Sequence, residues 1–308
     1  MTALLRCFVV AVSLIAVLML PATGYGWGDK GHEMINRLAA EAMPPQTPQF
    51  FRQAVERLAY LGPEPDRWRP AQGATEVPTL NAAAAPDHFL DMEFVAGFTL
   101  PRNRYDYLRA MLTNGVVTGD VKLETPGFLP YRIVELTEML RREWALWRTA
   151  PTRTRAERDR KRQIEENILH AAGVLGHYVG DGSNPHHTTW HYNGWVEARE
   201  PNPEGFTTAR GIHARFEADF VNQAVEIGIV QPLVPARRAV SDLFGSTMEY
   251  LRASHALVRD LYRLDKRRAF ELSPDRAAEN GEGRRFAAER LAAGAGMLRD
   301  LWVAAMGQ

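Results

Sequence analysis

The strongest signal in this chain is the stretch ILHAAGVLGHYVGDGSNPHHTTWHYNGW, residues 168–195. Five of the nine histidines crowd between His170 and His191. His177 and Asp181 lie four residues apart in a helical pattern, so an imidazole and a carboxylate leave the same face of one helix. Together these two side chains could bind one cation.

A second pair of the same kind, His213 and Glu217, occurs in GIHARFEADF. One such pair is more often an exposed or hydrogen-bonded pair than a metal site, whereas two pairs with His187 between them favour a metal. Nitrogen and carboxylate ligands without thiolate are typical of zinc in a water-accessible catalytic site, while magnesium and calcium prefer oxygen alone. The sequence therefore predicts a zinc site.

Outside this stretch, apolar residues recur at helical spacing. The clearest stripes are Met34, Leu38, Ala39 and Ala42, and Ile133, Leu136, Leu140 and Trp144. No segment shows sustained alternation of apolar and polar residues between hairpin turns. We therefore expect a single all-α domain over residues 27–308, a bundle of roughly eight to ten helices.

The beginning of the chain resembles an export signal. Residues 7–20 are apolar and uncharged, follow Arg6 and precede the small-residue motif GYG at 24–26, which is typical of signal-peptidase sites. Such a short apolar run does not comfortably span a membrane. We expect residues 1–26 to be a signal peptide, the protein to be secreted or periplasmic, and the mature chain to have no transmembrane segment.

The mature chain would begin at Trp27 and contain no cysteine, because the only one, Cys7, lies in the apolar run. Disulfides and thiolate metal sites are thereby excluded. Without Arg6 the 37 basic residues become 36 against 37 acidic ones, a formal charge of −1. This balance gives no global attraction to nucleic acid or anionic lipid, and no stable protein partner is implied.

Two segments rich in Pro, Gly, Thr and Asn, 69–87 and 193–211, are expected to be long loops, which in compact domains usually line sites. The basic segment 151–162, PTRTRAERDRKR, interleaves Arg with Glu and contains no aromatic residue. It predicts the solvated start of a helix rather than a patch that binds nucleic acid.

In chain order, the motifs WGDKGH, PDRW, DHFLD, HYVGDGSNPHH and GIHARFE resemble the ligand series of the superfamily that unites zinc-dependent phospholipase C with the single-strand-specific zinc nucleases. They run from Trp27 to Glu217, about two thirds of the mature chain. The resemblance implies an all-helical bundle with three zinc ions. The ligands that it implies are Trp27, His32, Asp66, His88, His177, Asp181, His187, His213 and Glu217.

By this resemblance, the first ion binds the α-amino nitrogen and carbonyl oxygen of Trp27, together with His32 and Asp181. The ligands of the second ion are Asp66, His88, His177 and Asp181. Asp181 would therefore bridge the first two ions. The ligands of the third, more exposed ion are His187, His213 and Glu217.

Binding through the α-amino group requires cleavage directly before Trp27. A free amine has a reference pKa of about 7.7, so it loses its proton to a metal far more easily than lysine does. The alternative is that Trp27 is only an aromatic residue of the core.

One motif departs from the family pattern. Where GDxHQPLH is usual, this chain has GDGSNPHH, so either His186 or His187 could be the ligand. His187 is favoured because it lies six residues after Asp181, as in the family. The remaining histidines expected to have structural roles are His170, His191 and His255. For His170, either burial or a contact that supports a ligand is expected.

The resemblance leaves the substrate open. Glu217 as the last ligand and the absence of cysteine resemble the phospholipase C branch, and we favour activity on phospholipid headgroups for that reason. The five-residue step from Trp27 to His32 and the 26-residue step from His187 to His213 resemble the nuclease branch, which cleaves single-stranded DNA or RNA. A secreted zinc-binding protein without catalytic activity is a further alternative.

Hydrolysis is favoured over mere zinc binding by two residues. Asp66, beside the metal cluster, supplies a carboxylate that can orient the attacking nucleophile, so we expect it to be catalytic. Phe89 follows the ligand His88 and would form an apolar or stacking wall for the substrate.

Overall fold

The computed structural model describes residues 27–69 and 76–307, so the expected signal peptide, 1–26, lies outside the described residues. Within those two ranges the chain is helical and forms no strand, apart from an isolated bridge between Tyr192 and Gly194. The all-α fold class is thereby confirmed. None of the helices described is both long and apolar enough to cross a membrane.

The longer helices of the described ranges are α2 (Gly28–Glu41), α8 (Arg104–Thr113), α9 (Leu129–Thr149), α10 (Arg155–Ser183), α14 (Leu243–His255), α15 (Val258–Lys266) and α16 (Ala277–Met306). The short α-helices are α3 (Gln49–Arg52), α4 (Val55–Leu61), α5 (Glu64–Arg67), α6 (Pro78–Ala84), α7 (Met92–Val95), α11 (Ile212–Ala214), α12 (Val221–Ala224) and α13 (Ile227–Val230). The remaining turns are the 3₁₀-helices η1 (Ala85–His88), η2 (Pro185–Thr188), η4 (Gln231–Leu233) and η5 (Pro274–Arg276), and the π-helix η3 (Arg215–Phe220). The expected helix number is too low because single turns leave no periodic pattern in the sequence.

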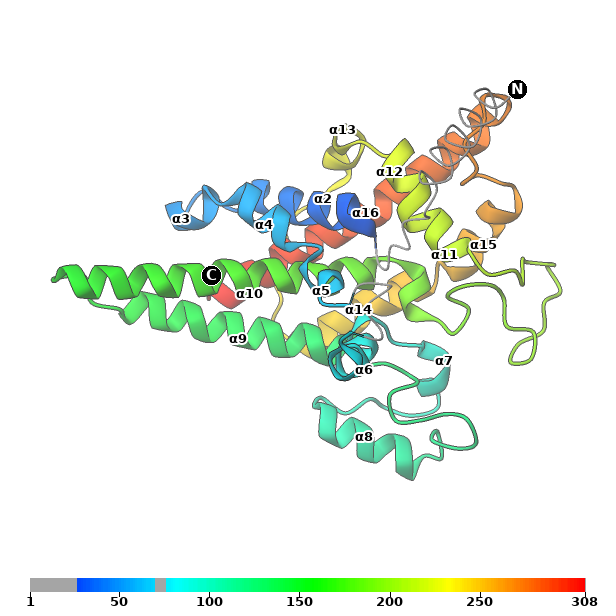
Figure 1. Ribbon diagram of the computed structural model, residues 1–308, viewed down its shortest axis with the longest axis horizontal. Helices are drawn as coiled ribbons and strands as arrows, with labels where there is room; N and C mark the ends of the chain where they lie inside the picture. Colours follow the sequence, from blue (N-terminus) through cyan, green and yellow to red (C-terminus); the bar gives the residue numbers. More distant parts are fainter. Residues whose placement is uncertain (1–26, 70–75, 308) are drawn as a thin grey trace, which may run out of the picture.

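Long helices form the core that supports the site. α9 and α10 run side by side, and α16 packs against both of them and against α2 (Figure 1). The buried Trp302 of α16 donates a hydrogen bond from Nε1 to the carbonyl oxygen of Ala172 in α10, at 3.1 Å. Trp144 of α9 and Phe51 of α3 are also buried, with ring centroids 5.7 Å apart. α10 is therefore held by several neighbours, which fixes the position of its last turns.

α10 can carry the site because glycines on its buried face let α2 come close. A Cβ atom at Gly176 would lie 1.8 Å from Asn36 Oδ1, and one at Gly180 would lie 2.8 Å from His32 Nδ1. Larger residues at these positions would push α2 away. The close approach stacks the rings of His32 and His177, whose centroids are 4.0 Å apart.

The first turn of α10 confirms the interpretation of segment 151–162. Thr154 and Glu157 form a capping box, in which each side chain accepts a hydrogen bond from the other residue's backbone nitrogen. The basic side chains of the segment are exposed or half-buried. This segment is therefore the solvated start of a helix.

One expected loop is partly helical. Segment 69–87 contains α6 and most of η1, while residues 70–75 lie outside the described ranges. Pro78 stands at the start of α6, where its fixed φ suits a helix, and the alanines at 82–85 have the highest helix propensity. The expectation of a continuous loop is wrong there. The other segment, 193–211, is irregular as expected.

Candidate metal centre

The last turns of α10, together with α5 and η1, place four side chains around one point. His177 Nε2 lies 3.0 Å from His88 Nδ1 and 3.3 Å from Asp181 Oδ2. Asp66 Oδ1 lies 3.6 Å from His177 Nε2 and 3.9 Å from His88 Nδ1. His88 Nδ1 is 3.0 Å from Asp181 Oδ2. The structure therefore brings together all the residues expected around the second ion.

Asp181 also faces the residues expected around the first ion. Its Oδ1 lies 3.5 Å from His32 Nε2, and the backbone nitrogen of Trp27 lies 3.2 Å from the same His32 atom. The Trp27 side chain is buried, and its Nε1 donates to the carbonyl oxygen of Gly180 at 2.7 Å and to Ser183 Oγ at 2.9 Å. Trp27 is thus a core aromatic residue whose backbone nitrogen lies beside the cluster.

The residues expected around the third ion also meet. His213 Nε2 lies 2.6 Å from Glu217 Oε2 and 3.1 Å from His187 Nε2. Glu217 lies in the π-helix η3, a conformation that often occurs at functional sites. Asn184 Nδ2 donates to Glu217 Oε2 at 2.8 Å and so orients the carboxylate.

The described part of the chain contains three groups of His, Asp or Glu side chains that could hold a metal ion. Within each group, the ligand atoms lie within 4.8 Å of one another. The groups are His32, Asp66 and His177; His88, His177 and Asp181; and His187, His213 and Glu217. The second and third groups agree with the expected ligand sets. The first group joins His32 to residues expected around the second ion, because the His32 and His177 rings are stacked.

Backbone carbonyls orient two of the histidines. His177 Nδ1 lies 2.9 Å from the carbonyl oxygen of Gly62, and His187 Nδ1 lies 2.7 Å from that of His88. A carbonyl only accepts hydrogen bonds, so Nδ1 carries a hydrogen in each ring and Nε2 is the nitrogen that faces the cluster. Metal-binding histidines are usually oriented in this way.

Two buried carboxylate oxygens of the cluster have no hydrogen-bond partner among the described residues. They are Oδ1 of Asp66 and Oδ1 of Asp181. An unpaired buried polar atom costs about 1–3 kcal/mol, and more where it is charged. A cation between these carboxylate oxygens and the neighbouring imidazoles would satisfy them, and this set of nitrogen and oxygen donors fits zinc.

The protonation of the cluster also fits a bound cation. Burial raises the pKa of Asp66 to about 7 and that of Glu217 to about 8. Burial lowers the pKa of His88 to about 3 and that of His213 to about 4, so both imidazoles are neutral and can donate a lone pair. A divalent cation would favour the ionised carboxylates that burial alone disfavours.

A cleft of about 860 Å³ opens onto this cluster. Cluster residues that line it are His88, His187, His213 and Glu217. Phe89 lines the same cleft, where it could contact a substrate. Segment 193–211, which was expected to line a site, contributes Asn193, Arg199 and Arg210 to the cleft wall.

The chain was also compared with known proteins. No family model and no curated protein sequence matches it. Among solved structures it is similar to the alpha-toxin of an avian strain of Clostridium perfringens, with 15% sequence identity and a TM-score of 0.45. The match covers 93% of this chain but 65% of the toxin chain, so the chain spans less than two thirds of the toxin's length. The assignment of a metal centre therefore depends on the geometry of this chain's own residues.

The structure distinguishes the two adjacent histidines of the GDGSNPHH motif. His187 belongs to the third ligand group, whereas His186 belongs to none of the groups found in the described ranges. Both ring nitrogens of His186 are buried there without a hydrogen-bond partner.

His170 is exposed, so both expectations for it are wrong: the face of α10 that is covered at His177 is open to solvent two turns earlier.

The other histidines have structural contacts, as expected. His191 Nε2 lies 3.0 Å from Glu200 Oε2, and its ring stacks on Trp195 with centroids 3.8 Å apart. His255 Nδ1 lies 2.8 Å from the carbonyl oxygen of Thr188, next to the ligand turn η2.

The sequence interpretation missed several side chains of the cleft wall. These include the arginine Arg69, which follows the PDRW motif, and the aromatic residues Phe94, Trp190 and Tyr192. The only sequence feature that could have predicted these residues is their short separation in sequence from the expected ligands. Trp190, for example, lies three residues after His187.

Proposed function

We propose that this chain is a zinc-dependent hydrolase of phosphodiester bonds that binds three zinc ions through the nine expected ligands. The observation that supports the proposal best is the presence of three His, Asp and Glu groups, one of which lines the cleft with all its members and another with His88. Bound zinc would stabilise negative charge on phosphate oxygens and lower the pKa of a water molecule. Removal of residues 1–26 as a signal peptide, with a secreted or periplasmic location, belongs to the same proposal.

The chain's own residues would position the reactants. Asp66 Oδ1 is buried without a partner among the described residues and faces His88 and His177, so it can orient a water molecule and accept its proton. Phe89 would pack against an apolar or aromatic part of the substrate. Arg210, which is exposed at the cleft, would attract the phosphate.

Two substrate classes fit this proposal. Phospholipid headgroups are favoured by Glu217 in the third ligand group, as in the phospholipase C branch. Single-stranded nucleic acid is the second candidate, because the cleft combines aromatic side chains such as Phe89 and Trp190 with arginines. Bases stack on aromatic rings, and cations attract the backbone phosphates.

A side-by-side assay tests the proposed hydrolase. Protein that begins at Trp27 is incubated with micelles of phosphatidylcholine or phosphatidylinositol and with denatured DNA, each with and without added zinc. We expect cleavage of at least one of these substrates, and only when zinc is bound. If fully zinc-loaded protein cleaves none of them, the chain is a zinc-binding protein without this activity.

The third ligand group allows a more local test. His213→Ala and Glu217→Gln should each lower kcat by about a hundredfold, because each removes one ligand of an ion next to the cleft. His170→Ala is the matched control, since this histidine is exposed on α10, and it should keep full activity. Zinc content and kcat are measured at limiting zinc. Normal kcat in both ligand variants would mean that His213 and Glu217 are only a hydrogen-bonded pair.

A further inference from the structure

Arg199 is held against two aromatic rings of the cleft. Its guanidinium carbon lies 4.7 Å from the ring centroid of Phe94 and 5.3 Å from that of Trp190, and all three side chains line the cleft. The two rings pack edge to face, with centroids 5.2 Å apart. Cation–π contacts of this kind hold a guanidinium in place and leave N–H groups at its edge free to donate.

The N–H groups of the Arg199 guanidinium have few partners among the described residues. Among the described residues the Arg199 side chain makes no hydrogen bond, and its one ion pair is with Asp120, at 3.9 Å. The Asp120 side chain is 91% exposed, so this pair contributes little. Two carboxyl groups of the cleft wall, Asp91 and Glu124, form no ion pair with Arg199 among the described residues. Asp91 is buried, and burial raises its pKa well above the usual range although the charge of Arg199 opposes the shift, so its uncharged form is favoured. Arg199 therefore retains donors and charge for a ligand.

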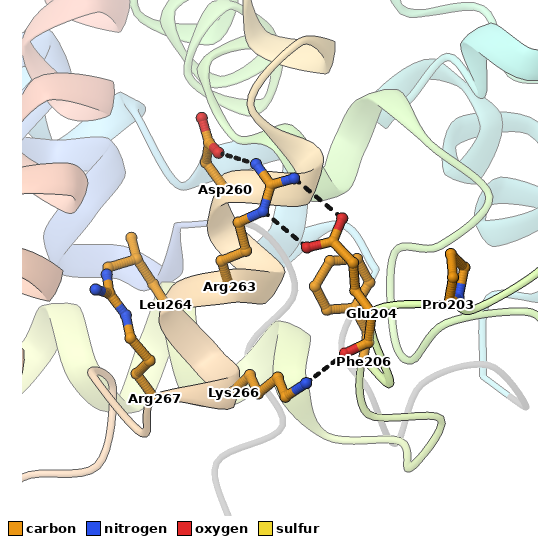
Figure 2. Close-up of a pocket in the computed structure, with 8 residues that line it drawn as sticks. All are labelled: Pro203, Glu204, Phe206, Asp260, Arg263, Leu264, Lys266 and Arg267. Atoms are coloured by element: carbon orange, nitrogen blue, oxygen red, sulfur yellow. Dashed lines mark hydrogen bonds and ion pairs between the residues drawn. The ribbon is translucent and has the colours of Figure 1, made fainter.

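A second pocket, of about 670 Å³ beside α15, shows the contrasting case (Figure 2). There Arg263 forms ion pairs with both Glu204 and Asp260, as the dashed lines show (Figure 2). Arg267, which also lines this pocket, pairs with Glu282. Each of these arginines already has an acidic partner, so the second pocket is no comparable site for an anion.

Helix α15, beside the second pocket, anchors the loop that carries Arg199. Arg259 of α15 forms ion pairs with Glu200 and Glu204 of the loop. The hydroxyl of Tyr262, also on α15, accepts a hydrogen bond from the backbone nitrogen of Gly194 at 3.1 Å. The loop is therefore fixed at both sides of the arginine, which lowers the entropy cost of binding a ligand there.

We propose that Arg199 forms a second anion subsite, which binds a phosphate group of the substrate other than the one that is hydrolysed. This inference rests on the proposed function, because it places a neighbour of the scissile phosphodiester in the same cleft. A quaternary ammonium headgroup is disfavoured there, since a cation already covers the faces of Phe94 and Trp190. A nucleotide chain or an inositol lipid with an additional phosphate would supply the required group.

Ligand pairs that differ by one phosphate test this subsite by equilibrium binding to the zinc-loaded protein. The nucleotide pair is thymidine 5′-phosphate and thymidine 3′,5′-bisphosphate. The headgroup pair is inositol 1-phosphate and inositol 1,4-bisphosphate. In at least one pair the additional phosphate should tighten binding about tenfold, the usual size of a charge-assisted contact, and the pair that responds identifies the source of the phosphate.

The variant Arg199→Gln should reduce this gain to about twofold, and Arg199→Lys should give an intermediate value because it keeps the charge but loses the fork of donors of a guanidinium. Arg155→Gln is the matched control: this arginine is 93% exposed at the start of α10, and its removal should keep the full gain. A gain that survives in Arg199→Gln, or no gain in either pair, would overturn the subsite. Hydrolysis of bis(p-nitrophenyl) phosphate is followed in parallel, and its absence in the unaltered protein would count against the hydrolase alone, since the binding measurement needs no turnover.

Discussion

Asp181→Asn is expected to lose two zinc ions together and nearly all phosphodiesterase activity. One oxygen of Asp181 faces His32, and the other faces His88 and His177, so a single carboxylate would serve both ions. An asparagine has only one oxygen and no negative charge, and its amide nitrogen is a donor rather than a ligand. We expect kcat/KM to fall about a thousandfold or more, because each lost ion removes several kcal/mol of transition-state stabilisation.

Metal analysis and activity assays check this result, and circular dichroism confirms that the variant is folded. Asp159→Asn is the control, because this carboxylate lies on the same helix, is partly exposed and pairs only with surface arginines in the described structure. It should keep all its zinc. Full zinc content in Asp181→Asn would show that Asp181 does not bridge.

Spacing along single helices could be predicted from the sequence alone. His177 and Asp181 face one cluster, and so do His213 and Glu217, because residues four apart share a helix face. Spacing does not say which helices meet. The approach of α2 to α10 depends on packing at Gly180, whose missing side chain leaves room for the His32 ring, and this requirement is visible only in three dimensions.

The surroundings of the ligands could not be predicted for a related reason. The carbonyl oxygen of Gly62 orients His177, but a backbone carbonyl has no residue type that a sequence could reveal. Arg199 stands in a segment without periodicity, so nothing in the sequence places it against Phe94 and Trp190. The family resemblance supplied the expected ligands and the sequence predicted Phe89 as a wall residue, whereas the positions of Arg199 and these two rings in the cleft wall are visible only in the fold.

The remaining prediction concerns the backbone nitrogen of Trp27. Its indole is buried and anchored to Gly180 and Ser183, and this anchor holds the backbone nitrogen 3.2 Å from His32 Nε2. As part of a peptide bond, that nitrogen has no available lone pair and can only donate a hydrogen bond. As a free α-amino group it would lose a proton at moderate pH and could bind the ion shared with Asp181.

Protein that begins at Trp27 is therefore expected to bind one more zinc ion, and to be about a hundredfold more active, than protein that keeps a single residue in front of it, because only the first has an amine at this position. Acetylation of the α-amino group should have the same effect as the extra residue, since it also creates an amide. One residue added at the opposite end of the chain is the matched control and should change neither quantity. His32→Ala should lower zinc content and activity in the Trp27 form to a similar degree, because it removes another ligand of the same ion. Equal zinc content and equal rates with and without the preceding residue would show that Trp27 serves only as a core aromatic residue and that His32 and Asp181 hold their ion without it.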